Sequence, residues 1–131
     1  MLDATDRRWL QASLSHAYDI VDKTLNRREA KVGRRNQVLY ALGRVRPFEF
    51  SFRDVEEILR AEFPASTAEK HLNVSGILSE LSKTTDPLVR RAPSPDKYIF
   101  TDPVFRMCLR AMLRKHGETV IRLDMAALGT A

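Results

Sequence analysis

The chain has 131 residues, of which 44% are hydrophobic and 30% charged, and its formal net charge is +5. The length suits one domain with an ordinary core, and the composition is that of a globular protein rather than a disordered one. No apolar run approaches the ~18 to 20 residues that a membrane span needs, and the first residues lack the apolar stretch of a signal peptide, so we expect a cytoplasmic protein with no membrane contact.

Charge changes sign along the chain. Residues 23–46 contain eight basic residues and one acid, residues 52–82 are acidic in balance, and residues 83–115 are basic again. A basic surface favours acidic partners such as nucleic acid. The single cysteine, Cys108, has no partner for an internal disulfide.

The first third of the chain has helical periodicity. Apolar residues recur at spacings of three and four over residues 5–27, which predicts an amphipathic helix. A polar segment then ends at Gly33, where we expect a break, and a second helix is predicted over residues 34–45.

Local signals then predict a strand and a third helix. Residues 48–50 alternate like a very short strand after Pro47. Ser51 and Asp54 have the spacing of a capping box, so we expect a helix over residues 52–62.

A second capping-box spacing predicts the fourth helix. Ser66 is followed three residues later by Glu69, and we expect a helix over residues 67–83. Asn73 is a candidate for a fresh cap, and Gly76 weakens a helix interior, so a kink is expected near Asn73.

A hairpin and a final helix are expected next. Residues 88–91 and 97–101 read as strands around a loop, 92–96, that two prolines stiffen. Asp102 and Pro103 are a strong helix start. For the segment after Gly117 the sequence leaves two alternatives, a short helix or a structure that depends on a partner.

This order of elements predicts the fold. A three-helix core with a β-hairpin wing is a winged helix, an α+β fold that is mostly α. We expect three parts: an N-terminal helical extension (residues 1–33), the winged helix with its C-terminal helix (34–116) and a C-terminal tail (117–131).

The motif "HLNVSGILSELSK…DPLVRRAPSPDKYIFTDPVFRMCLRAML" resembles the C-terminal winged-helix region that follows the nucleotide-binding core in some bacterial and archaeal AAA-type ATPases. The resemblance covers roughly residues 34–113, and the preceding helix is similar to the lid segment of those proteins. The chain has no Gly-x-x-x-x-Gly-Lys-Ser/Thr motif. It is therefore expected to be either a fragment of such an ATPase or a free-standing relative, without ATP chemistry of its own.

No catalytic or metal-binding constellation is evident, and we expect no enzyme activity and no cofactor. His16, His71, His116 and Cys108 are the only imidazoles and thiol, and none has another imidazole or thiol at helical spacing. Ser51 and Ser66 read as helix caps rather than as nucleophiles.

A winged helix binds DNA by placing the helix after the turn in the major groove and the wing on the backbone or the minor groove. The candidate contacts on the helix 67–83 and on the wing 88–101 are Lys70, His71, Asn73, Ser75, Ser79, Lys83, Arg90, Arg91 and Lys97. Glu69 and Glu80 on the same predicted helix argue against a surface that faces phosphate.

Two alternatives stay open. The first is a protein-interaction or self-association module that docks through the acidic helix 52–62 or the tail 118–131, without DNA contact. The second concerns the basic arm, which reads either as another phosphate patch or, slightly favoured, as a solvated linker; its members are Arg27, Arg28, Lys31, Arg34 and Arg35.

Overall fold

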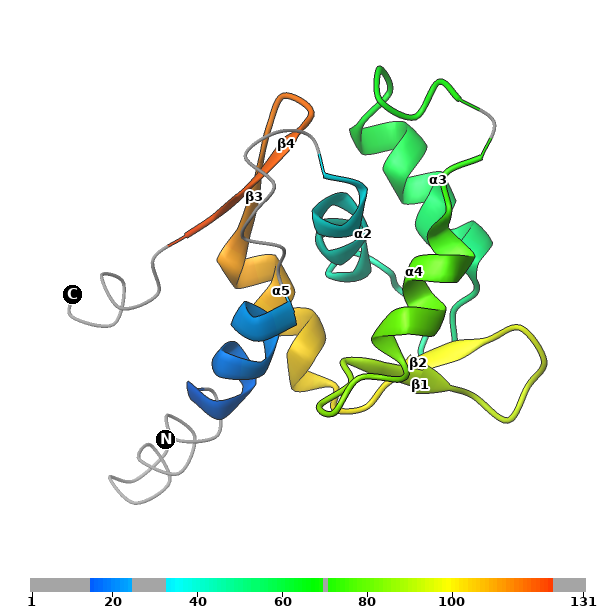
Figure 1. The fold of residues 1–131 in the computed structure, drawn as a ribbon, viewed down its shortest axis with the longest axis vertical. Helices are drawn as coiled ribbons and strands as arrows, with labels where there is room; N and C mark the ends of the chain where they lie inside the picture. Colours follow the sequence, from blue (N-terminus) through cyan, green and yellow to red (C-terminus); the bar gives the residue numbers. More distant parts are fainter. Residues whose placement is uncertain (1–14, 25–32, 70, 124–131) are drawn as a thin grey trace.

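A computed structural model describes residues 15–24, 33–69 and 71–123 (Figure 1). Within these ranges the fold is α+β and mostly helical. The helices are residues 15–24, α2 (Arg34–Leu42), α3 (Phe52–Glu62), α4 (Val74–Leu81) and α5 (Val104–Met112). The strands are β1 (Val89–Arg91), β2 (Tyr98–Phe100), β3 (Leu113–His116) and β4 (Thr119–Arg122), paired antiparallel as β1–β2 and β3–β4. In these ranges no helix has the length and apolar character to cross a membrane.

Helix α2 lies at the centre of the molecule (Figure 1). Six consecutive residues, 37–42, are buried, and the helix contacts α3, α4, α5 and both strands of the β3–β4 hairpin. Six consecutive buried residues cover every side of the helix, which explains why its apolar residues show a weaker periodicity than those of a surface helix. The helix ends at Leu42 rather than at the predicted residue 45, although Val45 is buried.

The predicted capping box of α3 is confirmed. The backbone N–H of Ser51 donates to Oδ2 of Asp54 at 2.8 Å, and the backbone N–H of Asp54 donates to Oγ of Ser51 at 3.4 Å. The predicted strand 48–50 is reduced to one residue: Phe50 exchanges two backbone hydrogen bonds with Tyr98, of 2.9 and 2.7 Å.

The predicted helix over residues 67–83 is wrong in its first half. Residues 64–67 form a turn, and α4 begins only at Val74, after Asn73 in the left-handed conformation with φ 60°. The N–H of Ser66 donates to Oε1 of Glu118 at 2.6 Å, so a distant side chain occupies the position that a local cap would need. The helix also ends earlier than predicted, at Leu81.

The β1–β2 hairpin forms where the sequence predicts it, with Val89 opposite Phe100 and Arg91 opposite Tyr98. In its loop the N–H of Lys97 donates to the carbonyl of Ser94 at 3.4 Å, and Asp96 has φ 59°. A positive φ at the third position is what a type II turn requires and proline is common at the second, so Pro95 and Asp96 fit that turn and restrict the loop's shape.

The start of α5 also follows the prediction, because Oδ1 of Asp102 accepts a hydrogen bond of 3.0 Å from the N–H of Val104. Directly after α5, the chain turns into the β3–β4 hairpin, whereas a short helix or a partner-dependent structure was expected after Gly117. Gly117, with φ 63°, lies in its turn, so the expected boundary between residues 116 and 117 falls inside this hairpin.

The two ends of the described chain meet. Arg122 Nε on β4 lies 2.7 Å from Asp22 Oδ1 on the helix 15–24. That helix also buries Ala17, Ile20 and Val21 in the same core as α2 to α5. Residues 5–14 and 25–27 of the predicted first helix lie outside the described residues.

Candidate nucleic-acid interface

The predicted DNA-facing residues of α4 and its N-terminal approach lie on the surface. His71, Asn73, Ser75 and Lys83 are exposed, and Ser79 is half-buried. Lys70 lies outside the described residues. The opposite side of α4 is buried through Val74, Ile77, Leu78 and Leu81. The helix therefore presents a polar face of hydroxyl, amide and ammonium groups.

The basic side chains of the hairpin lie beside this face. β1 contacts α4 and is the free edge of its sheet, because Phe50 pairs with β2 on the other side. Arg90 and Arg91 are both exposed, whereas Lys97 is half-buried. The guanidinium carbon of Arg91 lies 5.4 Å from the centre of the Tyr98 ring, a cation–π contact that limits the freedom of this side chain.

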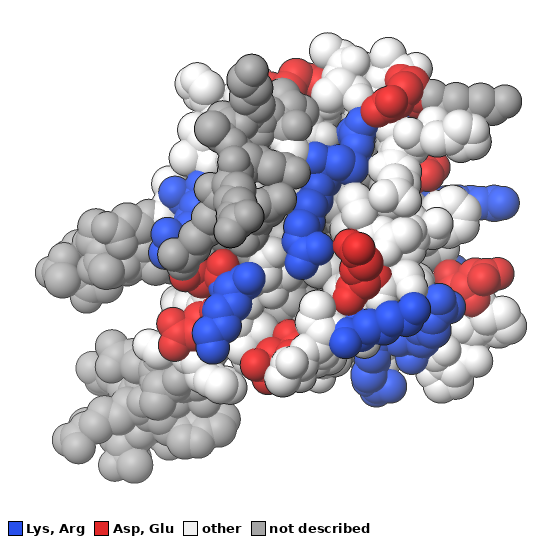
Figure 2. All heavy atoms as spheres, viewed as in Figure 1, with Lys and Arg blue, Asp and Glu red and all other residues white. Residues whose placement is uncertain are grey.

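Figure 2 shows positive side chains gathered over the lower end of α4 and the strands of the hairpin. A second row of positive side chains runs over α2, with a negative group near each end of the row. Negative side chains also lie beside the first group, so in this view both groups of positive side chains have acids nearby.

The acids that argued against phosphate contact are paired with arginines of α2. Arg34 Nη2 lies 2.6 Å from Glu69 Oε1, and Arg35 Nη1 lies 3.5 Å from Glu80 Oε2. Both carboxylates are solvent-exposed, so each pair adds little stability. Their effect is on charge, because each acid beside α4 has a cation next to it.

The same contacts change the interpretation of the basic arm. Besides its acid, Arg34 donates to the carbonyl of Ser66 at 2.7 Å, and Arg35 donates to the carbonyl of Thr24 at 3.2 Å. These two residues link α2 to its neighbours. The other members of the arm, Arg27, Arg28 and Lys31, lie outside the described residues.

The histidines and the cysteine thiol do not form a metal site within the described residues. In the described part of the chain, no three or more His, Cys, Asp or Glu side chains gather as metal ligands would. His16, His71 and His116 are exposed, and Cys108 is fully buried. Burial, and secondarily the charge of Asp102, raises the pKa of the Cys108 thiol to about 11, so it stays protonated and unreactive at neutral pH.

Sequence reasoning missed one charged cluster. Arg106 and Arg110 are one helical turn apart on α5 and lie near Arg44 and Arg46, which follow α2. The spacing of four residues on α5 was a visible signal, but the proximity of the second pair arises only from the packing of α5 against the end of α2.

Comparisons with protein-family models, with curated proteins and with solved structures find no match to this chain.

Proposed function

We propose that residues 34–100 form a winged helix that binds DNA through α4 and the β1–β2 hairpin. The order of elements supports this fold: helix α2, a one-residue bridge at Phe50, helices α3 and α4, and then two antiparallel strands. The pairing of Phe50 with the second strand is the sheet arrangement that a third wing strand would have.

In this proposal α4 enters the major groove and the hairpin contacts the backbone. Asn73 and Ser75 carry groups that hydrogen-bond to base edges, and Lys83, Arg90, Arg91 and Lys97 provide phosphate contacts. The stiff type II turn reduces the entropy lost when the hairpin docks. His71 and Ser79 flank the same face, and Lys70 precedes it in the sequence.

The observation that carries the proposal is the pairing of Glu69 and Glu80 with arginines of α2, at 2.6 and 3.5 Å. Without these pairs, two carboxylates beside α4 would repel phosphate. With them, the cations Lys83, Arg90, Arg91 and Lys97 of residues 83–97 outnumber the acids Asp86 and Asp96 of the same segment, which favours binding of a polyanion.

The test is fluorescence anisotropy with a labelled DNA duplex of about 20 base pairs, titrated between about 50 and 200 mM salt. The double substitution Arg91→Ala plus Lys97→Ala is expected to weaken binding and to lower the slope of log K against log salt by about 2, since each lost phosphate contact removes about 0.9. The matched control is Lys23→Ala plus Arg53→Ala, which removes the same charge from exposed positions on other elements. Equal affinities for the two variants would remove the hairpin from the proposal.

The relation to AAA-type ATPases is part of the same proposal. The chain would act as a DNA-binding module without catalysis of its own, beside a nucleotide-binding core. This relation predicts that the reading frame encoding the chain, or a neighbouring one, also encodes such a core. Purified chain that hydrolysed ATP by itself would contradict it.

The alternative is an interaction module that docks through α3 or residues 118–131. It predicts a molecular mass that rises with concentration in light scattering. Removing residues 118–131 would also remove β4 and the Glu118 bond to Ser66, so the cleaner truncation begins after Leu123. A concentration-dependent mass that this truncation abolishes, together with DNA binding unaffected by the hairpin double substitution, would favour this alternative.

A further inference from the structure

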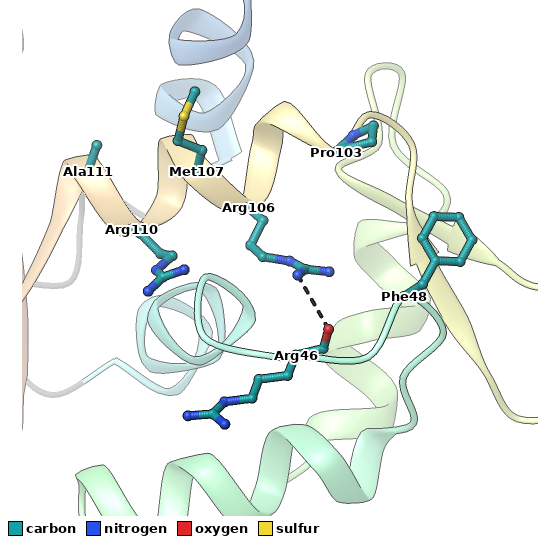
Figure 3. Close-up of a pocket in the computed structure, with 7 residues that line it drawn as sticks. All are labelled: Arg46, Phe48, Pro103, Arg106, Met107, Arg110 and Ala111. Atoms are coloured by element: carbon teal, nitrogen blue, oxygen red, sulfur yellow. Dashed lines mark hydrogen bonds between the residues drawn. The ribbon is translucent and has the colours of Figure 1, made fainter.

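A surface hollow lies between α5 and the segment that follows α2 (Figure 3). Its volume is about 650 Å³. It is lined by Arg46, Phe48, Pro103, Arg106, Met107, Arg110 and Ala111. An adjoining hollow of about 360 Å³ shares three of these arginines and adds Arg44. We call the two together the arginine hollow.

The arginine hollow results from the packing of α5. Phe105, Cys108, Leu109 and Met112 bury one face of this helix. The lining residues 103, 106, 107, 110 and 111 recur at spacings of three and four and occupy the outer face. Gly43 allows α2 and α5 to approach closely, because a Cβ there would lie 3.1 Å from the backbone nitrogen of Arg110. The approach brings Arg46 to the same hollow as Arg110.

Two of the arginines are fixed by the protein. Arg106 donates to the carbonyls of Arg46 and Pro47, each at 3.4 Å, and the first of these bonds is visible in Figure 3. The guanidinium carbon of Arg44 lies 3.5 Å from the centre of the Tyr40 ring. The partners in these contacts are the Tyr40 ring and backbone carbonyl groups, which carry no net charge, so the contacts do not neutralise the two guanidinium groups.

The other two arginines have no such contacts. In the described ranges, the guanidinium groups of Arg46 and Arg110 have no hydrogen-bond acceptor, and no carboxylate lines the arginine hollow. Asp54 and Glu57 share a separate hollow with Arg44 and Arg46. Arg106 and Arg110 do not line that hollow, so their guanidinium groups are the part of the cluster with no acid beside it among the described lining residues, and they are complementary to an anionic partner.

Apolar surface accompanies the charge. Phe48 is 68% exposed and Met107 is 50% exposed, and they are two of the three large hydrophobic residues with high exposure in the described part of the chain. Arginine, phenylalanine and methionine are enriched in protein interfaces, whereas lysine is depleted. The arginine hollow contains no lysine, in contrast to the face formed by α4 and the β1–β2 hairpin.

We propose that the arginine hollow docks an acidic segment of a partner protein that carries apolar side chains. Carboxylates pair with Arg46, Arg106 and Arg110, whose planar guanidinium groups bind them in bidentate geometry. Apolar side chains of the segment pack against Phe48 on one side of Arg106 and against Met107 on the other (Figure 3). The volume of the larger hollow, about 650 Å³, is within the range found for small-molecule binding sites. The proposal uses none of the residues assigned to DNA, so each can fail without the other.

The test uses two labelled peptides of about 12 residues in fluorescence anisotropy, with the full chain as the binding partner. One peptide is made of Asp and Glu with a Phe and a Leu at its centre, and in the other both apolar residues are Ser. The substitution Arg46→Glu plus Arg110→Glu is expected to weaken binding of both peptides by at least about tenfold. Phe48→Ser is expected to weaken the apolar peptide by about three- to tenfold and to leave the Ser peptide unchanged. The control is Lys23→Glu plus Arg53→Glu, an equal charge reversal at exposed positions elsewhere.

Four outcomes overturn the proposal. The first is no binding of either peptide to the unaltered chain. The second is equal loss in the control variant, since binding would then follow net charge alone. The third is tighter binding of single-stranded oligo(dT) than of the peptide, lost in the Arg46→Glu plus Arg110→Glu variant, which would make nucleic acid the occupant. The fourth is self-association of the unaltered chain that the same variant abolishes, which would make a second copy the occupant.

Discussion

Replacing Gln37 by leucine tests the best-connected polar group of the core. Gln37 is fully buried, and its Nε2 donates to the carbonyl of Glu118 at 2.8 Å and to Oγ of Ser66 at 3.0 Å. Its Oε1 accepts from Arg34 Nη1 at 2.9 Å. Two neutral bonds contribute about 1 kcal/mol each and the charged one about 1.5 to 3, offset by about 1 for the added apolar surface. We expect the free energy of unfolding to fall by about 2.5 to 4 kcal/mol.

The assay is urea denaturation followed by circular dichroism, with Ser66→Ala as the companion variant. Ser66→Ala alone is expected to cost about 1 kcal/mol, and the double variant less than the sum of the two, because both remove the same bond. A loss below about 0.5 kcal/mol for Gln37→Leu, or strict additivity, would refute this account of the Gln37 contacts. Amide exchange of β4 provides an independent check, since the Glu118 carbonyl bond holds this hairpin against α2.

Three further predictions concern stability. Gly43→Ala is expected to lower the free energy of unfolding by about 1 to 3 kcal/mol in thermal melts, because the new Cβ would lie 3.1 Å from the Arg110 nitrogen and 3.2 Å from the Leu109 Cβ; an unchanged melting temperature would contradict the close approach of α2 and α5. Asp96→Gly is expected to keep or slightly raise stability, whereas Asp96→Val lowers it by about 1 to 2 kcal/mol, since φ is 59° there; equal melting temperatures would show that the turn relaxes. The pKa of the Cys108 thiol is raised from 9.0 to about 11 in the folded chain, so the thiol of the unfolded chain ionises first as pH rises. We therefore expect the free energy of unfolding to be unaffected by this group below pH 9 and to fall by about 2 to 3 kcal/mol between pH 9 and 11, as measured by denaturation curves. The variant Cys108→Ala should not show this part of the pH dependence.

Elements with a local code could be predicted from the sequence. The Ser51 capping box and the Asp102 side-chain cap join residues two or three positions apart, and the β1–β2 hairpin pairs residues no further apart than Val89 and Phe100. The same kind of signal failed at Ser66, because the partner of its N–H is Glu118, 52 residues away. A capping-box spacing therefore predicts a helix only where no distant group takes over the cap.

The β3–β4 hairpin had a signal that was overlooked. Gly117 is followed by the run Thr119-Val120-Ile121, in which β-branched residues favour a strand. The candidate interface, in contrast, could be predicted only in part. Its cations could be read from the sequence, but the pairing of Glu69 with Arg34 joins residues 35 positions apart and depends on the tertiary packing.

The contact between Asp22 and Arg122 has a consequence for folding kinetics. It closes a loop of 122 − 22 = 100 residues, so the entropy lost on closing it is among the largest of any contact in the described chain. We therefore expect the helix 15–24 and β4 to dock after α2, α3 and α4 have collapsed around each other. In local unfolding we expect the reverse order. The contact between the helix 15–24 and β4 breaks first, while the amide groups of α2, α3 and α4 stay protected from hydrogen exchange.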